Sequence, residues 1–282
     1  MRPPRPEDAP AVAAMGSPYA PEPLDVVWVE REWSEPGFDP AADARMTGDA
    51  YIAVWDGRNG KAWIDALGRP SGELLAWAEG HARAKGLVRA FGGGWAGDEL
   101  ILALFEQAGY RLARHFYRMR VELADVPDRP SWPDGIAVRT FLPGDERTFY
   151  DVHQETFADH WEHDVPHPYE EWAHWLLQPP MHEPELWLLA DDGGEPAGIA
   201  ICHRRHDAPG VGTVDILGVR GPWRRRGLGR ALLLHAFAEL RRAGLTAADL
   251  GVDAASLTGA NRLYESVGMH VAAGRDTYEK AL

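Results

Sequence analysis

Residues 214–233 read VDILGVRGPWRRRGLGRALL, and this stretch decides the fold. The apolar run that ends at Val219 predicts a strand, and the amphipathic run that begins at Gly229 predicts a helix. Gly227 and Gly229 leave room for a ligand's phosphates close to the main chain, beside the positive end of the helix. Arginines at positions 224–226 and 230 add full charges that can pair with phosphate oxygens. The stretch therefore predicts a cradle for a pyrophosphate group.

Two common nucleotide-binding loops do not match this turn. It lacks the Lys-Ser/Thr ending of a P-loop, and its glycines do not have the GxGxxG spacing of dinucleotide-binding folds. Arg224-x-x-Gly227-x-Gly229 instead resembles the motif of the GNAT acetyltransferase family, Arg/Gln-x-x-Gly-x-Gly/Ala after a strand. Leu263-Tyr264-x-x-x-Gly268-Met269 resembles the family's closing Leu-Tyr-x-x-x-Gly-Phe motif. Both motifs fall in the strand and helix contexts that the family requires.

The resemblance implies transfer of an acetyl group from the cosubstrate acetyl-CoA to an amine. The pantetheine arm would lie against the strand that ends at Val219. Main-chain N–H groups near Leu217 to Val219 would stabilise the tetrahedral oxyanion, and a distortion of the strand would expose them. The implied acetyl-CoA contacts are Leu217, Val219, Arg224, Arg225, Arg226, Gly227, Leu228, Gly229 and Arg230.

Two side chains are candidates for proton transfer. The resemblance places the general acid at Tyr264, because a phenol with a pKa near ~10 can hydrogen-bond a leaving thiolate whose thiol has a pKa near ~8.5. Asp215 is the candidate general base, directly or through water, since strand alternation puts it on the face of Leu217. Each has a plainer alternative: Tyr264 as a packing residue, and Asp215 as a partner of a neighbouring backbone group.

The sequence contains an internal repeat, in which segments of the first half resemble segments of the second half. The Arg2 to Asp8 segment recurs as Arg139 to Asp145, and each Asp is a candidate helix cap. LFEQAGY at 104–110 recurs as LYESVGM at 263–269. The repeat predicts an α+β chain of two tandem GNAT domains, each a mixed, mostly antiparallel central sheet flanked by helices. The expected parts are domain 1–124, a Pro- and Asp-bearing linker 125–134, and a catalytic domain 135–282.

The first copy has lost the residues of the cradle. An offset of 158 places Ala66, Arg69 and Ser71 where the second copy has Arg224, Gly227 and Gly229, and an offset of 159 places Phe105 at Tyr264. Domain 1–124 is therefore expected to be structural, and Gly92-Gly93-Gly94 within it to be a flexible loop. This tandem arrangement resembles, in architecture, that of the mycothiol synthases and other bacterial two-domain acetyltransferases.

The segment 156–175, TFADHWEHDVPHPYEEWAHW, is the candidate acceptor side, because in GNAT folds this region flanks the amine. Aromatic rings beside carboxylates suit an organic cation. A metal held by His160 and His163 with Asp159 or Asp164 is the less favoured alternative, because no closed tetrahedral spacing appears and the family needs no metal. The expected acceptor contacts are Asp159, Trp161, Glu162 and Asp164.

The composition bears on the partners and the location of the protein. A formal net charge of -14 argues against a nucleic-acid partner, and no apolar run approaches the ~20 residues of a membrane helix. The start of the chain has no apolar stretch of signal-peptide type, and Cys202 is a single cysteine, so a cytoplasmic monomer or homodimer is expected.

The sequence favours an N-acetyltransferase that moves an acetyl group to a primary amine of a small molecule by direct attack in a ternary complex. Two alternatives stay open. One is a non-catalytic protein that binds or senses acyl-CoA, and the other is a protein or peptide N-acetyltransferase. The acceptor and the preferred acyl chain are not determined by these residues.

Overall fold

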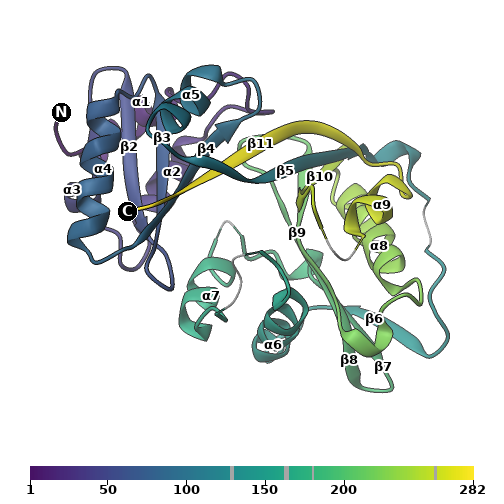
Figure 1. Cartoon of the computed structure of the whole chain (residues 1–282). Coiled ribbons are helices and arrows are strands. Elements are labelled where there is room, and N and C mark those ends of the chain that lie inside the picture. Colours follow the sequence, from purple (N-terminus) through teal and green to yellow (C-terminus); the bar gives the residue numbers. More distant parts are fainter. Residues whose placement is uncertain (128–129, 162–164, 180, 257–258) are drawn as a thin grey trace. The chain divides into compact units, whose positions relative to one another are not determined.

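A computed structural model describes residues 1–127, 130–161, 165–179, 181–256 and 259–282. They form two compact units, drawn in Figure 1. The first unit comprises 1–117, 253–255 and 272–282, and the second comprises 118–252 and 256–271. Each unit is a mixed, mostly antiparallel sheet with helices packed on it, so the expected fold class is confirmed.

In the first unit the strand order is β1-β2-β3-β4-β11-β5. Only the β3–β4 pair is parallel among the pairings described for it. Ile52, Ile64, Leu74 and Phe105 belong to a core between the sheet and helices α4 and α5. The elements are η1 (Pro6–Asp8), α1 (Ala9–Ala13), α2 (Val26–Trp33), α3 (Pro40–Asp43), β1 (Ala44–Met46), β2 (Ala50–Asp56), β3 (Lys61–Gly68), α4 (Gly72–Ala84), β4 (Arg89–Trp95), α5 (Glu99–Gln107), β5 (Arg111–Glu122) and β11 (His270–Ala281).

In the second unit the strand order is β5-β10-β9-β8-β7-β6, with β5 continuing from the first unit. Strands β6 to β9 are antiparallel neighbours, and β9 pairs with β10 in parallel. The elements are η2 (Leu123–Asp125), β6 (Ile136–Thr140), α6 (Glu146–Phe157), α7 (Tyr169–Leu176), η3 (Pro184–Leu186), β7 (Leu188–Asp192), β8 (Glu195–Arg204), β9 (Val211–Val219), η4 (Gly221–Trp223), α8 (Leu228–Arg242), β10 (Ala247–Asp253) and α9 (Ala260–Glu265).

Helices α6 and α8 pack closely on strands β8 and β9, and glycines in these strands make the approach possible. A Cβ on Gly218 would lie 2.4 Å from Thr156 Oγ1 of α6. A Cβ on Gly212 would lie 2.6 Å from Leu240 Cδ2 of α8. Because real Cβ contacts are not this short, both helices depend on glycine for their distance from the sheet.

The repeated Arg and Asp residues make the same contact in each unit. Arg2 forks onto Asp8 with two bonds of 2.7 Å, and Arg139 forks onto Asp145 at 2.5 and 2.8 Å. Neither carboxylate caps the helix that follows it, contrary to expectation. Each instead also accepts the backbone N–H three residues before it, because the paired Arg turns the side chain back towards the strand.

Gly92-Gly93-Gly94 is part of β4, so the expected flexible loop is wrong. The glycines serve packing: a Cβ on Gly92 would lie 2.4 Å from the Phe105 ring, and one on Gly93 would lie 1.9 Å from the carbonyl oxygen of Asp276. Sequence composition signalled flexibility, whereas the contacts across the sheet require residues without side chains.

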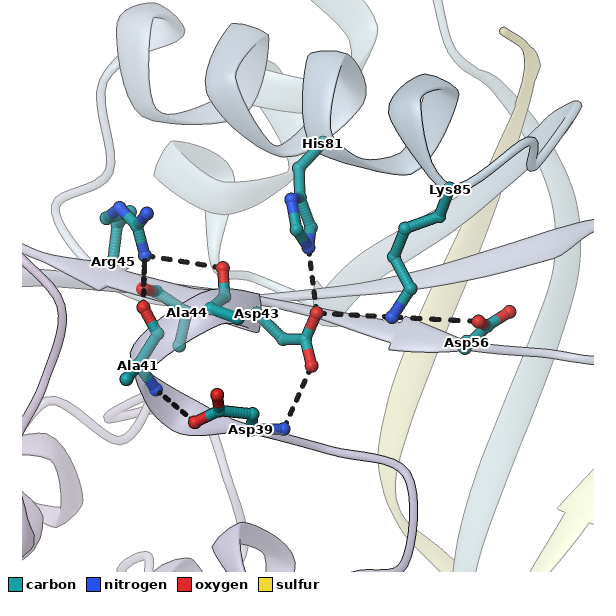
Figure 2. Close-up of polar contacts among 9 residues, drawn as sticks. Asp39, Ala41, Asp43, Ala44, Arg45, Asp56, His81 and Lys85 are labelled. Atoms are coloured by element: carbon teal, nitrogen blue, oxygen red, sulfur yellow. Dashed lines mark hydrogen bonds and ion pairs between the residues drawn. The ribbon is translucent and has the colours of Figure 1, made fainter.

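A buried carboxylate anchors α4 in the first unit (Figure 2). Asp43 Oδ1 lies 2.8 Å from His81 Nε2 and 3.1 Å from Lys85 Nζ, and Asp43 Oδ2 accepts the Asp39 N–H at 2.9 Å. Burial disfavours the charge, but these hydrogen bonds outweigh it and lower the pKa of Asp43. The carboxylate therefore stays ionised and joins α4 to the start of β1.

The C-terminal strand returns to the first unit. Residues 275–281 of β11 pair antiparallel with 95–89 of β4, so the contacts assign 272–282 to the first unit rather than to the expected domain 135–282. The repeat could not indicate this, because similarity between two copies says nothing about which sheet edge the last strand joins. In the expected linker 125–134, residues 128–129 lie outside the described part of the chain.

Candidate active site

Strands β9 and β10 separate part-way along their length. Their parallel ladder runs from the Val211–Ala247 pair to the Thr213–Asp249 pair. Beyond it β9 continues to Val219 and β10 to Asp253 without a further pair between them among the described residues. The main-chain groups on these facing edges do not bond to each other, so those without another partner are available to a ligand.

The free edge of β9 presents the N–H groups of Leu217 and Val219. The Arg220 N–H donates to Ala197 O at 3.0 Å on the β8 side, and Gly198 lies opposite Val219. Since main-chain groups alternate along a strand, the N–H groups of Leu217 and Val219 point away from β8, towards the separated β10. This is the arrangement that the expected oxyanion donors need.

A bulge interrupts β9 at Asp215. Cys202 lies opposite Val214 and Ile201 lies opposite Ile216, so Asp215 is an extra residue without a partner on β8. The strand is thus distorted two residues before Leu217. Burial nevertheless alternates from Asp215 onward: Asp215 is exposed and Leu217 is half-buried, whereas Ile216 between them is buried. Asp215 is exposed. Burial, and to a lesser degree the charge of Asp215, raises the pKa of the Cys202 thiol.

The turn after β9 leads into helix α8, whose N-terminus has no side-chain cap. Arg225 has φ 60° and Gly227 has φ 86°, and Gly227 is the N-cap of α8 with no side-chain cap. The Ala231 N–H donates to Gly227 O at 3.0 Å, so the amides of Leu228, Gly229 and Arg230 precede the intrahelical bonds. Free amides at a helix N-terminus attract anions, which fits the expected phosphate cradle.

The arginines of the turn have different environments. Arg224 Nε donates to Val219 O at 2.9 Å, and Arg224 Nη1 lies 4.0 Å from Asp159 Oδ2. Arg225, Arg226 and Arg230 are exposed and have no hydrogen-bond or ion-pair partner in the described part of the chain. Arg224 therefore holds the turn against β9, whereas the other three carry unpaired charge beside the helix start.

Gly227 and Gly229 have different backbone conformations. The positive φ of Gly227 is a conformation that other residues adopt at a cost. Gly229 is an ordinary helical residue, and a Cβ there would meet Leu263 Cδ2 at 3.5 Å and Val219 Cγ2 at 3.6 Å, both normal contacts. The contacts within the protein would thus accept alanine at position 229 and do not require glycine there.

Tyr264 lies on α9 with its ring buried. Burial raises the pKa of its hydroxyl to about 12, so the phenol keeps its proton at neutral pH. No hydrogen-bond partner of this hydroxyl occurs among the described residues. The ring of Tyr264 is buried, as expected of a packing residue, and its hydroxyl remains free to donate a hydrogen bond.

The corresponding place in the first unit is closed. Ser71 is the N-cap of α4, and its Oγ accepts the Leu74 N–H at 3.3 Å, so this helix start is satisfied by its own side chain. The β3–β4 ladder also stops early, after the Ile64–Gly92 pair, but the fully buried ring of Phe105 packs directly on Gly92. The helix start of the first copy thus differs from that of the second, whose N-cap Gly227 has no side-chain cap.

The expected acceptor residues are only partly described. Asp159 follows α6, and its exposed carboxylate faces Arg224; Trp161 is partly buried, and Glu162 and Asp164 lie outside the described residues. Helix α7 packs against α6 through Trp172, whose Nε1–H donates to His153 Nδ1 at 2.9 Å. No group of three or more metal-ligating side chains occurs among the residues that the structure describes.

Similarity to known proteins agrees with this geometry. Residues 147–269 match the model of the Acetyltransferase (GNAT) family. The mycothiol acetyltransferase of Thermobispora bispora is 33% identical over 247 residues, which cover 79% of this chain and 80% of that protein. The mycothiol acetyltransferase of Thermomonospora curvata is 33% identical and covers 82% of this chain and 73% of its own length.

The chain belongs to the GNAT family of acetyltransferases. Among solved structures, the GCN5-related N-acetyltransferase of Sphaerobacter thermophilus is 31% identical, with a TM-score of 0.81 over 99% of this chain and 94% of that one. A tandem GNAT protein from the clavulanic acid biosynthesis pathway is 15% identical, with a TM-score of 0.72 over 97% and 93%, which supports the fold. This GNAT chain is an acyltransferase, and none of its described helices is long and apolar enough to cross a membrane.

Proposed function

We propose that this GNAT enzyme transfers an acetyl group from acetyl-CoA to the primary amine of a small molecule. The observation that carries the proposal is the early end of the β9–β10 ladder beside the uncapped start of α8. A thioester arm needs unpaired main-chain groups along its length, and a pyrophosphate needs free amides and positive charge at its end. The second unit offers both within one strand-turn-helix segment.

The phosphates would be held by the amides of Leu228 to Arg230, with Arg225, Arg226 and Arg230 as the nearest unpaired charges. The pantetheine arm would lie along the free edge of β9. The substrate nitrogen then attacks the thioester carbonyl carbon, and the N–H groups of Leu217 and Val219 would donate hydrogen bonds to the developing oxyanion. Collapse of this tetrahedral species breaks the carbon–sulfur bond.

Two proton movements accompany this step. The attacking amine must lose a proton, and Asp215, exposed at the bulge, is the proposed base, directly or through water. The leaving sulfur needs a donor, and the Tyr264 hydroxyl, protonated and unpartnered, is the proposed one. Because a phenol with a pKa of about 12 is a weaker acid than a thiol, Tyr264 would stabilise the thiolate by a hydrogen bond rather than by full proton transfer.

The test combines calorimetric titration with acetyl-CoA and a thiol-release assay across a panel of small amines that includes the acceptor of the mycothiol acetyltransferases. Cys202 is buried and is the single cysteine, so it adds little background to a thiol reagent. We expect one acetyl-CoA per chain, and turnover that Asp215→Asn lowers at least tenfold with unchanged acetyl-CoA affinity. Absence of binding would contradict the cosubstrate, and binding without thiol release on any amine would contradict the acceptor class.

A further inference from the structure

The rung at which β9 and β10 part consists of two buried polar residues, Thr213 and Asp249. Their exposed fractions are 6% and 1%. Thr213 Oγ1 donates a hydrogen bond to the main-chain carbonyl oxygen of Asp249 at 3.2 Å. A side-chain hydroxyl thus binds the carbonyl of β10 at the last pair of the backbone ladder.

The carboxylate of Asp249 is held from two sides. Arg118 of β5 donates to Asp249 Oδ1 at 3.2 Å, and Arg205, which follows β8, donates to Asp249 Oδ2 at 2.6 Å. Arg205 also pairs with Asp207, which balances its charge. A buried carboxylate with a partner on each oxygen is costly to displace, so this network fixes the position of β10 at the last rung.

The other edge of β9 changes direction just beyond this rung. The extra residue at the bulge, Asp215, follows Thr213 by two positions. Bulges increase the local twist of a strand. The ion pairs of Asp249 therefore hold β10 in place, while the bulge at Asp215 changes the direction of β9. The ion pairs lie on the β10 side of β9, and the bulge lies in its pairing with β8.

We propose that Thr213 and Asp249 are positioning residues that stop the ladder and keep the N–H groups of Leu217 and Val219 open for the thioester. The proposal rests on the proposed function for its ligand. Without the stop, the free main-chain groups of β9 and β10 would pair with each other, because strand edges that run side by side form hydrogen bonds. A ligand would then have to break those bonds before it could bind.

The test compares Thr213→Val, which removes the hydroxyl, with Thr213→Ser, which keeps it. In the free protein, we expect the Leu217 and Val219 amides to exchange with deuterium several-fold more slowly in Thr213→Val, since the ladder extends. We also expect the Kd and KM for acetyl-CoA to rise roughly fivefold to tenfold, the net worth of one hydrogen bond, with little change in kcat. Thr213→Ser should behave as the wild type in all three measurements.

Thr277→Val is the matched control, because Thr277 is also buried but lies in the first unit, at 7% exposed. It should leave both amides and the Kd unchanged. Asp249→Asn is the second variant and should shift the amides and the Kd in the same direction as Thr213→Val. Equal exchange in Thr213→Val and Thr213→Ser would overturn the proposal. If the wild type binds no acetyl-CoA, the proposed function fails, while the exchange rates still decide whether Thr213 stops the ladder.

Discussion

Arg224 Nε donates a hydrogen bond to the carbonyl oxygen of Val219 at 2.9 Å, so the arginine that opens the family motif is bound to the end of the strand that precedes it. The contact closes the turn between β9 and α8. Its energetic role therefore differs from that of the unpaired arginines beside it, and substitutions can separate the two.

We expect Arg224→Gln to lower the free energy of unfolding by about 1 kcal/mol, the worth of a hydrogen bond, and to weaken acetyl-CoA binding to a similar degree at low and high salt. Arg226→Gln should leave stability unchanged and should weaken binding mainly at low salt, because an exposed charge is screened. Thermal unfolding and calorimetry at two ionic strengths measure both effects. Identical salt dependence of the two variants would contradict the distinction.

Gly227→Ala and Gly229→Ala should have opposite effects on stability. Alanine at position 227 would have to hold φ at 86°, at a cost of about 1–2 kcal/mol, whereas alanine at 229 replaces a helical glycine and should stabilise by up to ~1 kcal/mol. Both should weaken acetyl-CoA binding, the second because its methyl group occupies ligand space. Denaturant unfolding and calorimetry test this.

Gly244→Ala is the control for the strain of Gly227→Ala, since Gly244 follows α8 with φ 87° and lies at the far end of the helix. It should lose a similar amount of stability and retain wild-type affinity for acetyl-CoA. An unchanged affinity in Gly229→Ala would show that the ligand does not approach this backbone.

Tyr264→Phe should lower kcat by roughly tenfold to a hundredfold and leave the Kd for acetyl-CoA within about twofold, because the ring still packs and only the donor to sulfur is lost. The pH–rate profile of the wild type should show no limb from this residue between pH 6 and 9, since the pKa of Tyr264 is raised to about 12. Steady-state kinetics across this range provides the measurement. A kcat equal to that of the wild type would assign Tyr264 to packing alone.

The same pKa predicts a loss of stability in alkali. Below pH ~10 the phenol is neutral in both the folded and the unfolded chain; above it the unfolded chain releases the proton while the folded chain retains it up to about pH 12. The free energy of unfolding should therefore fall across this window by roughly 2–3 kcal/mol from Tyr264. The difference between wild type and Tyr264→Phe in denaturant titrations isolates this contribution, and parallel curves for the two proteins would refute it.

Much of the second unit follows from local sequence patterns. The strand that ends at Val219 and the helix that follows Gly227 lie where the apolar patterns of the sequence predicted them. The difference between the two copies was also visible, because Ser71 and Phe105 replace Gly229 and Tyr264 in the repeat. Such features are local. A glycine, a run of arginines or a periodic spacing of apolar residues affects the conformation of residues that are close to it in the sequence.

The sequence by itself determined the family motifs, the repeat and the order of strand, glycine turn and helix in the cradle. The tertiary structure alone decided that β11 joins the first unit, that Asp215 lies on a bulge, that Arg224 binds Val219, and that Thr213 meets Asp249 at the last rung. The physical reason is the range of the interactions. Strand register and buried ion pairs join residues far apart in the chain, and their energies depend on which sheet edges meet, which no local pattern specifies.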